Sequence, residues 1–349
     1  MSAARTLVPH IVALAAAAGL AVAVWTKDEK PEALAAERVE VWGGKPDELT
    51  GISYETEKLR VQLEPRKDSQ GRWYAATLEK TTEKPAVKPA ADGGAPQMPP
   101  GGDAGAPKQE SKRETQHFVA VKEADKLAES VAPLMGLRRL GKIEDARAEE
   151  FGFNKPEGTL RVAFGSRQHS LLIGGTTPGG GDRYAKDTET GNVFAIPGDV
   201  ARSLQFAESR LVERNLHAFK PEDVKRVKIT KGQATRELVR VLEKKDGWAD
   251  AATPDKLDET AGNWMAKLGR LSVQQHIESL GVPVLPEYQV VKVEYFDGKK
   301  SLGHLDLIRI PDDKSNAGFL AQTEYTRWYA QVLKSAGEQV QQDLPSVIK

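Results

Sequence analysis

The sequence predicts an α+β protein, in which an N-terminal transmembrane helix is followed by two tandem repeats of an antiparallel sheet packed with helices. Three observations lead to this prediction: an uncharged segment near the N-terminus, a segment rich in Pro, Gly and Ala, and a strand and helix pattern that occurs twice. The chain of 349 residues carries 50 Lys and Arg, 50 Asp and Glu, and no Cys. Its balanced charge argues against nucleic-acid binding. The lack of Cys excludes disulfides, thiolate metal sites and a Cys nucleophile.

The first element is the uncharged segment at residues 7–25. It contains no Asp, Glu, Lys or Arg, and its length is close to the roughly 20 residues that span a bilayer as a helix. Arg5 precedes it and a net negative stretch follows, so the positive-inside rule places the N-terminus in the cytoplasm. We therefore expect residues 1–26 to be a single-pass anchor in the inner (cytoplasmic) membrane, with a periplasmic body. A cleaved signal peptide is the alternative, because Ala21-Val22-Ala23 has a small-x-small form.

The second observation concerns residues 81–114, a segment of low complexity. Pro, Gly and Ala dominate it, and it has no Ile, Leu, Phe, Trp or Tyr. Such a segment buries too little apolar surface to offset the entropy lost on ordering. We therefore expect a disordered insertion at 81–114.

The third observation is an internal repeat. Trp73 and Trp248 each follow an alternating apolar pattern and a polar turn, which is typical of a β-hairpin. Downstream, the alternating segment 160–164 matches segment 291–295 at an offset of 131 positions (291 − 160). Further on, a Thr-Glu pair at position 188 matches one at position 323, at an offset of 135 (323 − 188). The order of all these features agrees, which indicates a tandem duplication.

Each repeat has the same predicted order of elements. A strand pair ends at the Trp, and a helix follows, with apolar residues three or four apart over 127–134 and 257–271. A link with Gly and Pro leads to three short strands, and a closing helix over 198–212 or 332–344 ends the repeat. Because hairpins join most strands, we expect antiparallel sheets. The sequence shows no β-α-β alternation with Gly-rich turns, so we do not expect a Rossmann arrangement.

The repeat predicts two domains after the anchor. These are residues 27–215, which include the insertion, and residues 216–349. We expect Trp73 and Trp248 each to lie buried between the sheet and the helix of its own repeat. An exposed Trp would instead be an aromatic residue of a binding face.

The link and the strands after it carry a family resemblance. The motifs are Phe151-Gly152-Phe153, Pro156, Ile173-Gly174, Tyr184 and Val193-Phe194. They resemble the bacterial family called domain of unknown function 4340. The likeness covers about residues 35–345, although the second repeat departs from it with Leu280-Gly281-Val282-Pro283. The resemblance implies an envelope protein associated with auxiliary components of ABC transporters of the gliding-motility type, and it implies no known catalytic residue.

No constellation of residues points to catalysis or to a cofactor. The closest two His are 28 positions apart (304 − 276), so no zinc motif exists. Residues 174–182 are Gly-rich, but they lack the Lys-Ser/Thr of a phosphate loop and lead into a strand, so we expect a hairpin loop. A basic stretch alternates along strands beside acidic residues, which indicates a solvated sheet face, with an anion-binding face as the alternative. The stretch comprises Lys225, Arg226, Lys228, Lys231, Arg236 and Arg240. We predict no catalytic, cofactor-binding or metal-binding residue and no cofactor.

The sequence therefore favours a non-enzymatic, membrane-anchored envelope scaffold or adaptor, accessory to an ABC-type transporter or to motility or export machinery. The expected partner is a membrane protein, either a transporter subunit or part of an envelope complex. We also expect the chain to contact the inner membrane through residues 7–25. Nucleic acid is not an expected partner. The alternative is a ligand-binding module with a glycan or peptide site between the two repeats. An enzyme with an unfamiliar carboxylate site is a third hypothesis.

Overall fold

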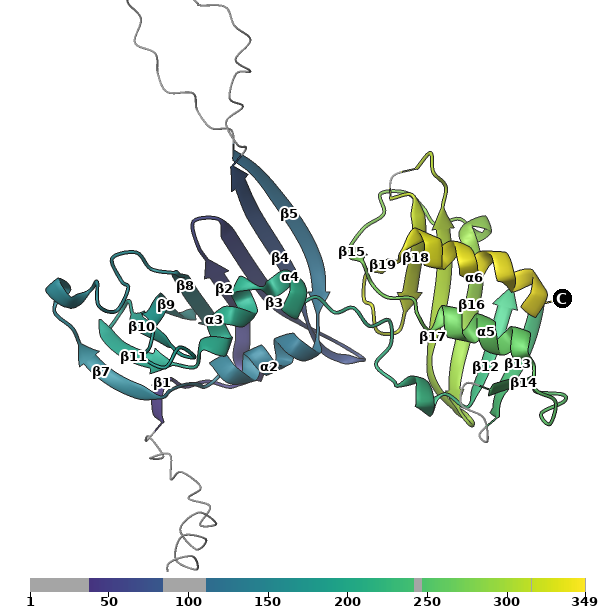
Figure 1. The fold of residues 1–349 in the computed structure, drawn as a ribbon, viewed down its shortest axis with the longest axis horizontal. Coiled ribbons are helices and arrows are strands. Elements are labelled where there is room, and N and C mark those ends of the chain that lie inside the picture. The colour runs from purple at the N-terminus through teal and green to yellow at the C-terminus, as the bar shows by residue number, and fades with distance from the viewer. Residues whose placement is uncertain (1–37, 84–110, 242–246, 315, 349) are drawn as a thin grey trace, which may run out of the picture.

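The computed structural model describes residues 38–83, 111–241, 247–314 and 316–348. These residues form two lobes, each built on one antiparallel sheet with helices on one of its faces (Figure 1). We call residues 38–213 lobe 1 and residues 214–348 lobe 2, because the main core of lobe 1 ends at Val212 and that of lobe 2 begins at Leu216.

Lobe 1 contains a nine-stranded sheet in the order β5-β4-β3-β2-β8-β9-β10-β11-β7, and a two-stranded sheet of β1 with β6. The strands are β1 (Val39–Trp42), β2 (Leu49–Glu55), β3 (Leu59–Asp68), β4 (Gly71–Glu83), β5 (Ser111–Ala120), β6 (Leu134–Gly136), β7 (Arg138–Lys142), β8 (Gly158–Phe164), β9 (Arg167–Thr176), β10 (Arg183–Asp187) and β11 (Asn192–Ile196). The helices are α2 (Lys122–Val131), α3 (Gly198–Gln205) and α4 (Ala207–Arg210), with short 3-10 turns η1 (Pro46–Glu48) and η2 (Asp145–Arg147).

Lobe 2 contains an eight-stranded sheet in the order β14-β13-β12-β16-β17-β18-β19-β15. The strands are β12 (Arg226–Lys231), β13 (Ala234–Val241), β14 (Gly247–Asp250), β15 (Gln275–Ile277), β16 (Gln289–Asp297), β17 (Lys300–Ile310), β18 (Gly318–Thr323) and β19 (Tyr329–Gln331). The helices are α5 (Glu259–Leu268) and α6 (Lys334–Val347), with 3-10 turns η3 (Pro221–Asp223) and η4 (Pro286–Tyr288).

Apart from β5, the two large sheets share one strand order. The series β4-β3-β2-β8-β9-β10-β11-β7 corresponds strand by strand to β14-β13-β12-β16-β17-β18-β19-β15. The same turn precedes the equivalent strands β2 and β12: Lys45-Pro46 opens η1, and Lys220-Pro221 opens η3 175 positions later (220 − 45). In both turns the Lys N–H donates to a carboxylate three residues on, at 3.1 Å. The two lobes are therefore topologically equivalent, while the domain boundaries at residues 26 and 215 stay a prediction.

Alternation of side chains places the apolar residues of each strand under the helices. In β3, Val61 and Leu63 are buried while the residues on either side of them are not, as the period of two in a strand requires. In α2, the buried residues Ala124, Leu127 and Val131 recur at helical spacing and face the sheet. Each lobe thus builds its own core between one sheet and the helices that cover it.

The predicted fold class is wrong in two respects. The described residues form mostly antiparallel β-sheets, and the helices are few and short. The longest described helix, α6, has 14 residues, which at 1.5 Å per residue gives about 21 Å, less than the roughly 30 Å of a bilayer core. In the described ranges, no helix has the length and apolar character needed to cross a membrane.

This finding overturns the predicted transmembrane helix. The single-pass membrane assignment and the location at the inner membrane with a periplasmic body are corrected with it. Residues 7–25, on which those predictions rested, lie outside the residues that the structure describes. The prediction rested on the length of the uncharged run and on the charges at its two ends, and this Ala-rich run is only moderately apolar.

The segment predicted as a disordered insertion begins and ends in paired strands. Glu83 of β4 lies opposite Ser111 of β5, and the pairing continues without interruption to Tyr74 opposite Ala120. Cross-strand hydrogen bonds order these ends even though few apolar side chains are present, since a ladder depends on the backbone. Residues 84–110 lie outside the described part of the chain.

The two predicted core tryptophans differ in position. Trp248 is buried in the core of lobe 2, as predicted, but Trp73 lies outside the main core of lobe 1. The register gives the reason: Trp248 pairs with Arg240, whose equivalent in lobe 1 is Pro65 (240 − 175), and Pro65 pairs with Tyr74. Tyr74 therefore takes the core position, and its neighbour Trp73 points to the opposite face of the sheet.

Trp248→Ala is expected to lower the free energy of unfolding by about 3–5 kcal/mol, the usual cost of truncating a large buried aromatic side chain. Trp248→Phe keeps a ring in the site and should cost less. Chemical denaturation of both variants beside the wild type measures the difference. A loss below about 1 kcal/mol for Trp248→Ala would mean that the indole does not fill the core.

Two glycine motifs of lobe 1 pack backbone against backbone. Gly152 has a φ of +76°, and Gly174 lies against the carbonyl of Phe151 and the ring of Phe153. The N–H of Gly175 donates to the Phe151 carbonyl at 2.8 Å. A Cβ at Gly152 or Gly174 would overlap neighbouring backbone atoms, so both positions require Gly. The Phe151-Gly152-Phe153 link and the end of β9 therefore form one packing unit.

Gly174→Ala is expected to destabilise lobe 1 by about 1–3 kcal/mol, because the added methyl group overlaps backbone that cannot move aside. Gly175→Ala is the matched control, since its Cβ would meet its nearest neighbour at 3.7 Å, an ordinary contact. Thermal unfolding of the two variants tests the difference. Equal melting temperatures would show that the link does not pack as described.

Candidate functional site

The two lobes meet at a small apolar contact. Trp73 of β4 and Trp328, in the turn between β18 and β19, lie edge to face with ring centroids 6.1 Å apart and an interplanar angle of 85°. Ala75, Val119 and Val121 of lobe 1 complete this cluster. Strand β15 also lies beside β5 at this contact. The open face of lobe 1, not its core, thus provides the surface that lobe 2 covers.

An ion pair flanks the two tryptophans. Arg327 Nε donates to Asp68 at 3.0 Å, and the Arg327 side chain is only 5% exposed. Burial alone would raise the pKa of Asp68, but hydrogen bonds from Arg327 and from the Gln70 N–H outweigh it and hold the pKa below its ordinary value. Arg327 has a φ of +57°, a conformation that non-glycine residues rarely adopt. The turn is therefore held in an unusual shape that brings its guanidinium to lobe 1.

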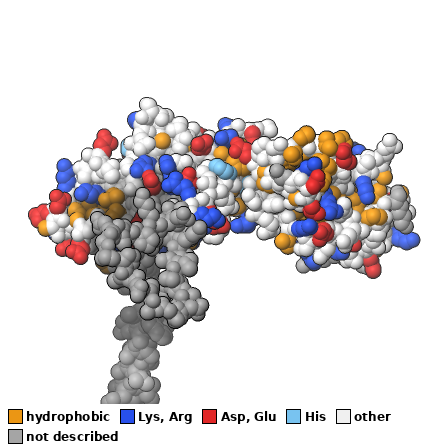
Figure 2. All heavy atoms as spheres, turned by 90° about the horizontal axis from the view of Figure 1, so that it is seen from above, with side chains coloured by type: hydrophobic (Ala, Val, Ile, Leu, Met, Phe, Trp, Pro, Cys, Tyr) orange, Lys and Arg blue, Asp and Glu red, His pale blue; other side chains and the backbone are white. Residues whose placement is uncertain are grey.

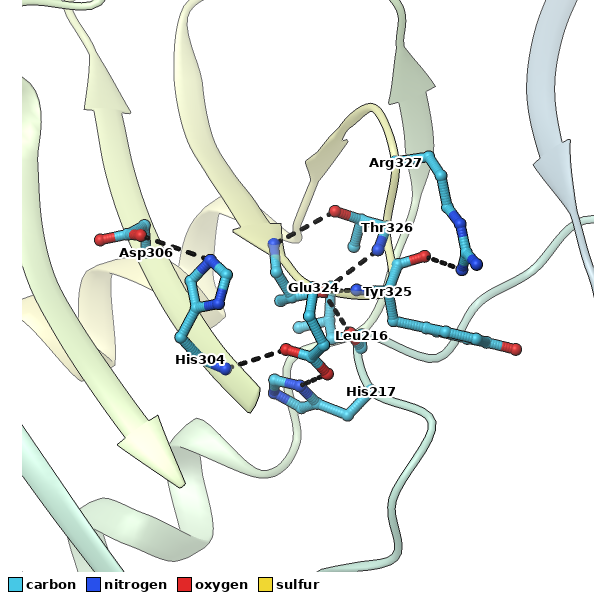
Figure 3. A network of polar contacts seen from close by, with 9 residues as sticks. Leu216, His217, His304, Asp306, Glu324, Tyr325, Thr326 and Arg327 are labelled. Atoms are coloured by element: carbon cyan, nitrogen blue, oxygen red, sulfur yellow. Dashed lines mark hydrogen bonds and ion pairs between the residues drawn. The ribbon is translucent and has the colours of Figure 1, made fainter. Parts of the chain in front are cut away.

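Threonine hydroxyls fix the turn that carries Arg327 and Trp328 (Figure 3). Thr323 Oγ1 donates to the Leu216 carbonyl and accepts from the N–H groups of Tyr325 and Thr326, at 3.0 and 3.1 Å. The Thr323 N–H donates in turn to Thr326 Oγ1 at 3.2 Å. Both threonines are buried. Since Leu216 lies at the start of lobe 2, these bonds tie the turn to the segment that links the lobes.

Glu324 is the centre of the polar network in Figure 3. Its carboxylate accepts the His304 backbone N–H at 2.9 Å and lies 3.1 Å from His217 Nδ1. Because a carboxylate only accepts, that nitrogen of His217 carries the proton. A Cβ at Gly303 would overlap the carboxylate of Glu324, so a glycine makes room for it. Structural hydrogen bonds thus occupy the carboxylate of Glu324.

A buried carboxylate, that of Glu213, joins the linking segment to the same turn. The hydroxyl of Tyr325 donates to Glu213 Oε2 at 3.1 Å, while Glu213 Oε1 accepts from the backbone and side chain of Asn215. Burial raises the pKa of Tyr325, with the charge of Glu213 as a further cause. Tyr325 therefore stays a neutral donor over the physiological pH range.

A groove runs along the junction. Its larger hollow, about 520 Å³, is lined by residues 66–70 and Trp73 of lobe 1 and by Glu324, Arg327 and Trp328 of lobe 2. A second hollow of about 340 Å³ is lined by Gln70, Lys292, Glu294, residues 301–304 and Glu324. The two hollows adjoin, because Gln70 and Glu324 line both of them. We call the two hollows together the junction groove. Charges of both signs are interspersed over the face in Figure 2.

Four of the six residues of the basic stretch predicted in lobe 2 form ion pairs. Lys225 pairs with Asp297, Arg226 with Glu237, Lys228 with Glu294, and Arg236 with both Asp250 and Asp258. These pairs fit the interpretation of a solvated sheet face. Residues 174–182 comprise the end of β9 and the hairpin loop 177–182 that leads to β10, as expected. Among the described residues, no three His, Asp or Glu gather closely enough to hold a metal ion.

The structure brings together side chains that are far apart in the sequence. His217 and His304 both meet Glu324, and Asp68 meets Arg327, 259 positions away. The Thr-Glu pair at position 323 was visible as a match to position 188, but a repeat pattern does not indicate contact. Nothing in the sequence pointed to Asp68 or to Arg327, because their pairing depends on how one lobe sits on the other.

A buried histidine makes the stability of lobe 2 depend on pH. His276 of β15 is 3% exposed, and its Nδ1 has no hydrogen-bond partner among the described residues. Burial, together with the charge of Arg214, lowers the pKa of His276 to about 4. The unfolded chain therefore takes up this proton first, near its ordinary pKa of about 6.5, which favours unfolding as the pH falls.

Lowering the pH from about 6.5 to about 4 is expected to cost at most about 3 kcal/mol of unfolding free energy through His276. Urea denaturation at several pH values measures the loss. His276→Leu should flatten the dependence in this window, and His117→Gln, at an exposed position, should leave it intact. An unchanged pH profile in His276→Leu would show that another group is responsible.

Comparison with known proteins gives one match. The model of the family described as domain of unknown function (DUF4340) matches residues 120–291, from the end of β5 in lobe 1 to the start of β16 in lobe 2. No similarity to a curated protein or to a solved structure is found. The matched range includes the Phe151-Gly152-Phe153 link and the glycine pair that packs on it. Over residues 120–291 the chain thus resembles the DUF4340 family, as these motifs indicated.

Proposed function

We propose that this protein is a non-enzymatic adaptor that binds an extended, acidic segment of a partner protein in the junction groove. The observation that carries the proposal is the composition of the groove: the β3–β4 hairpin of lobe 1 forms one wall, and β16, β17 and the turn after β18 of lobe 2 form the other. Sites at the interface of two domains are common places for ligands.

The side chains of the junction support binding more than catalysis. The carboxylate of Glu324 is engaged by His217 and by a backbone N–H, and that of Asp68 by Arg327. A general acid or base needs a proton that it can exchange with a substrate. Carboxylates that already accept structural hydrogen bonds are poorly placed for that role.

The tryptophans favour a peptide over a glycan as the occupant. Trp73 is 7% exposed and Trp328 is 9% exposed, since each ring is used for the contact between the lobes. A sugar ring needs an open aromatic face on which to stack, and neither indole offers one. An extended peptide instead needs a long groove with polar and charged walls, which the hairpin and the strands supply.

The charges of the groove favour an acidic segment. Each of its three acidic residues already has a partner: Asp68 pairs with Arg327, Glu324 is bonded to the His217 ring, and Glu294 pairs with Lys228. Lys67 and Lys292 add positive charge on opposite walls of the groove. Complementary charge speeds association and sets the partner's orientation. A transporter subunit is the partner class that the family resemblance implies, and it is the first candidate to test.

The double variant Lys67→Glu/Lys292→Glu is expected to lose the partner, because it reverses the charge on both walls of the groove. Tagged wild-type and variant chains would be purified from cells in mild detergent, and the retained proteins compared by quantitative mass spectrometry. A partner of the groove should fall by about tenfold or more, which corresponds to about 1.4 kcal/mol of binding free energy.

The matched control is Lys155→Glu/Lys231→Glu, which makes the same change of charge at two exposed positions outside the groove. The control should retain the partner at the wild-type level. Equal retention by the groove variant and the wild type, or equal loss in both variants, would contradict a charged site in the junction groove.

A further inference from the structure

The two lobes carry different side chains at one equivalent position. Counted back from the shared Lys-Pro turn, Trp42 stands three residues before Lys45, and His217 stands three residues before Lys220. The two sheets share one strand order. The surroundings of Trp42 in lobe 1 therefore show which part of lobe 2 the equivalent position faces.

In lobe 1, the indole of Trp42 fills the space between the sheet and the C-terminus of α2. The residue is 5% exposed, and its ring stacks on His169 with centroids 5.1 Å apart. Its Nε1–H donates to the carbonyl of Val131, the last residue of α2, at 2.8 Å. The indole thus satisfies one of the carbonyls that a helix leaves unpaired at its C-terminus.

In lobe 2, His217 stands at this position and lines the cavity described next. Its imidazole is directed toward Glu324 (Figure 3), and it stacks on Phe219 with ring centroids 4.5 Å apart. Helix α5 corresponds to α2, because its buried residues have the same spacing and its last residue, Leu268, matches Val131. No residue of lobe 2 is equivalent in both position and chemistry to the indole of Trp42 among those described.

A cavity of about 590 Å³ opens beside the C-terminus of α5. Its volume lies within the roughly 300–1,000 Å³ that is usual for small-ligand sites. The apolar part of its wall comes from Phe219, Trp248, Met265, Leu268 and Tyr295. Arg214 and Arg270 also line it and are exposed, so the cavity opens to solvent. We call this cavity the α5 pocket.

We infer that the α5 pocket binds the indole of a tryptophan side chain on a partner segment. Lobe 1 contains this arrangement within its own chain: an indole, on a segment that enters the lobe, placed between the sheet and the end of the helix. Lobe 2 has the same sheet and the same helix end, with a cavity where the indole would lie.

The walls of the α5 pocket suit an indole. The flexible thioether of Met265 can adapt to a flat ring, and the guanidinium groups of Arg214 and Arg270 can lie over its face. The C-terminus of α5 carries the negative end of the helix dipole. Its Leu268 carbonyl, which matches that of Val131, accepts the Leu271 N–H at 3.1 Å and keeps a second lone pair for an indole N–H. An aliphatic side chain would fill part of the volume but could not donate.

The α5 pocket is a second site, distinct from the junction groove. Arg214, Met265 and Leu268 do not line the groove, and Lys67 and Lys292 do not line the pocket. Either site can therefore fail its test while the other passes. If both hold, the partner contacts lobe 2 through an acidic segment and through a tryptophan.

The probe for this site is N-acetyl-tryptophanamide, titrated into the full chain and followed by NMR of ¹⁵N-labelled backbone amides. We expect saturable shifts at Met265 and Leu268 with a dissociation constant of about 1 mM or below, as suits a single small side chain. N-acetyl-leucinamide should give no saturable shifts, and an N1-methylated indole should bind more weakly because it cannot donate. A Gly-flanked tryptophan peptide should bind at least as tightly as the amide.

Ala266→Trp is the blocking variant, because Ala266 is an exposed residue of α5 that lines the pocket. It should weaken binding of the probe by about tenfold or more. Thr260→Trp is the control, at an exposed position of the same helix that does not line the pocket, and it should bind like the wild type. Lys67→Glu/Lys292→Glu should also bind the probe normally.

Three results would overturn the inference. The first is equal binding of the leucine and tryptophan amides. The second is undiminished binding by Ala266→Trp, with the variant shown to be folded by its amide spectrum. The third is tight binding of free indole together with no binding of the tryptophan peptide, which would assign the pocket to a small molecule and not to a partner's side chain.

Discussion

The turn between β18 and β19 is the element on which the two-lobed arrangement depends. It places Arg327 and Trp328 against lobe 1, where they meet Asp68 and Trp73. The left-handed conformation of Arg327 costs about 1–2 kcal/mol, and the threonine hydroxyls that cap the turn offset this cost. Since the guanidinium is almost fully buried, an unpaired Arg327 would be strongly unfavourable. The ion pair therefore specifies how the lobes sit together more than it stabilises either lobe.

The same bonds decide what chemistry the junction can support. Glu324, Asp68 and Glu213 are acidic groups that a catalytic site would need, yet each already accepts hydrogen bonds from neighbouring residues. Asp68 and Glu324 line the junction groove together with Lys67 and Lys292. A surface of that kind suits recognition of a partner, and its specificity then comes from shape and charge.

A shared topology allows the lobes to diverge at single positions with large effects. One residue of difference in the hairpin register moves a tryptophan from the core in lobe 2 to the open face in lobe 1. At another position, Trp42 of lobe 1 is replaced by His217 in lobe 2: the indole is buried against α2, while the histidine lines a cavity. The strand order is preserved through both differences because backbone pairing does not depend on these side chains.

The sequence by itself determined the local elements and their repetition. Alternation in 160–164 and 291–295 and helical spacing in 127–131 and 261–268 correspond to β8, β16, α2 and α5, because these periods are properties of the local backbone. It also indicated the family resemblance. The transmembrane helix predicted from the uncharged run at residues 7–25 was wrong, since lack of charge is not by itself evidence of a spanning helix. The strand ends inside 81–114 were missed because their pairing joins residues that are distant in the sequence.

Only the tertiary structure decided the face of Trp73, the contact of Asp68 with Arg327, the contacts of Glu324 and the cavity beside α5. Each of these depends on the register of a hairpin, on the packing of elements within lobe 2, or on the placement of one lobe against the other. Local periodicity carries no information about any of these, because it does not specify which surfaces meet.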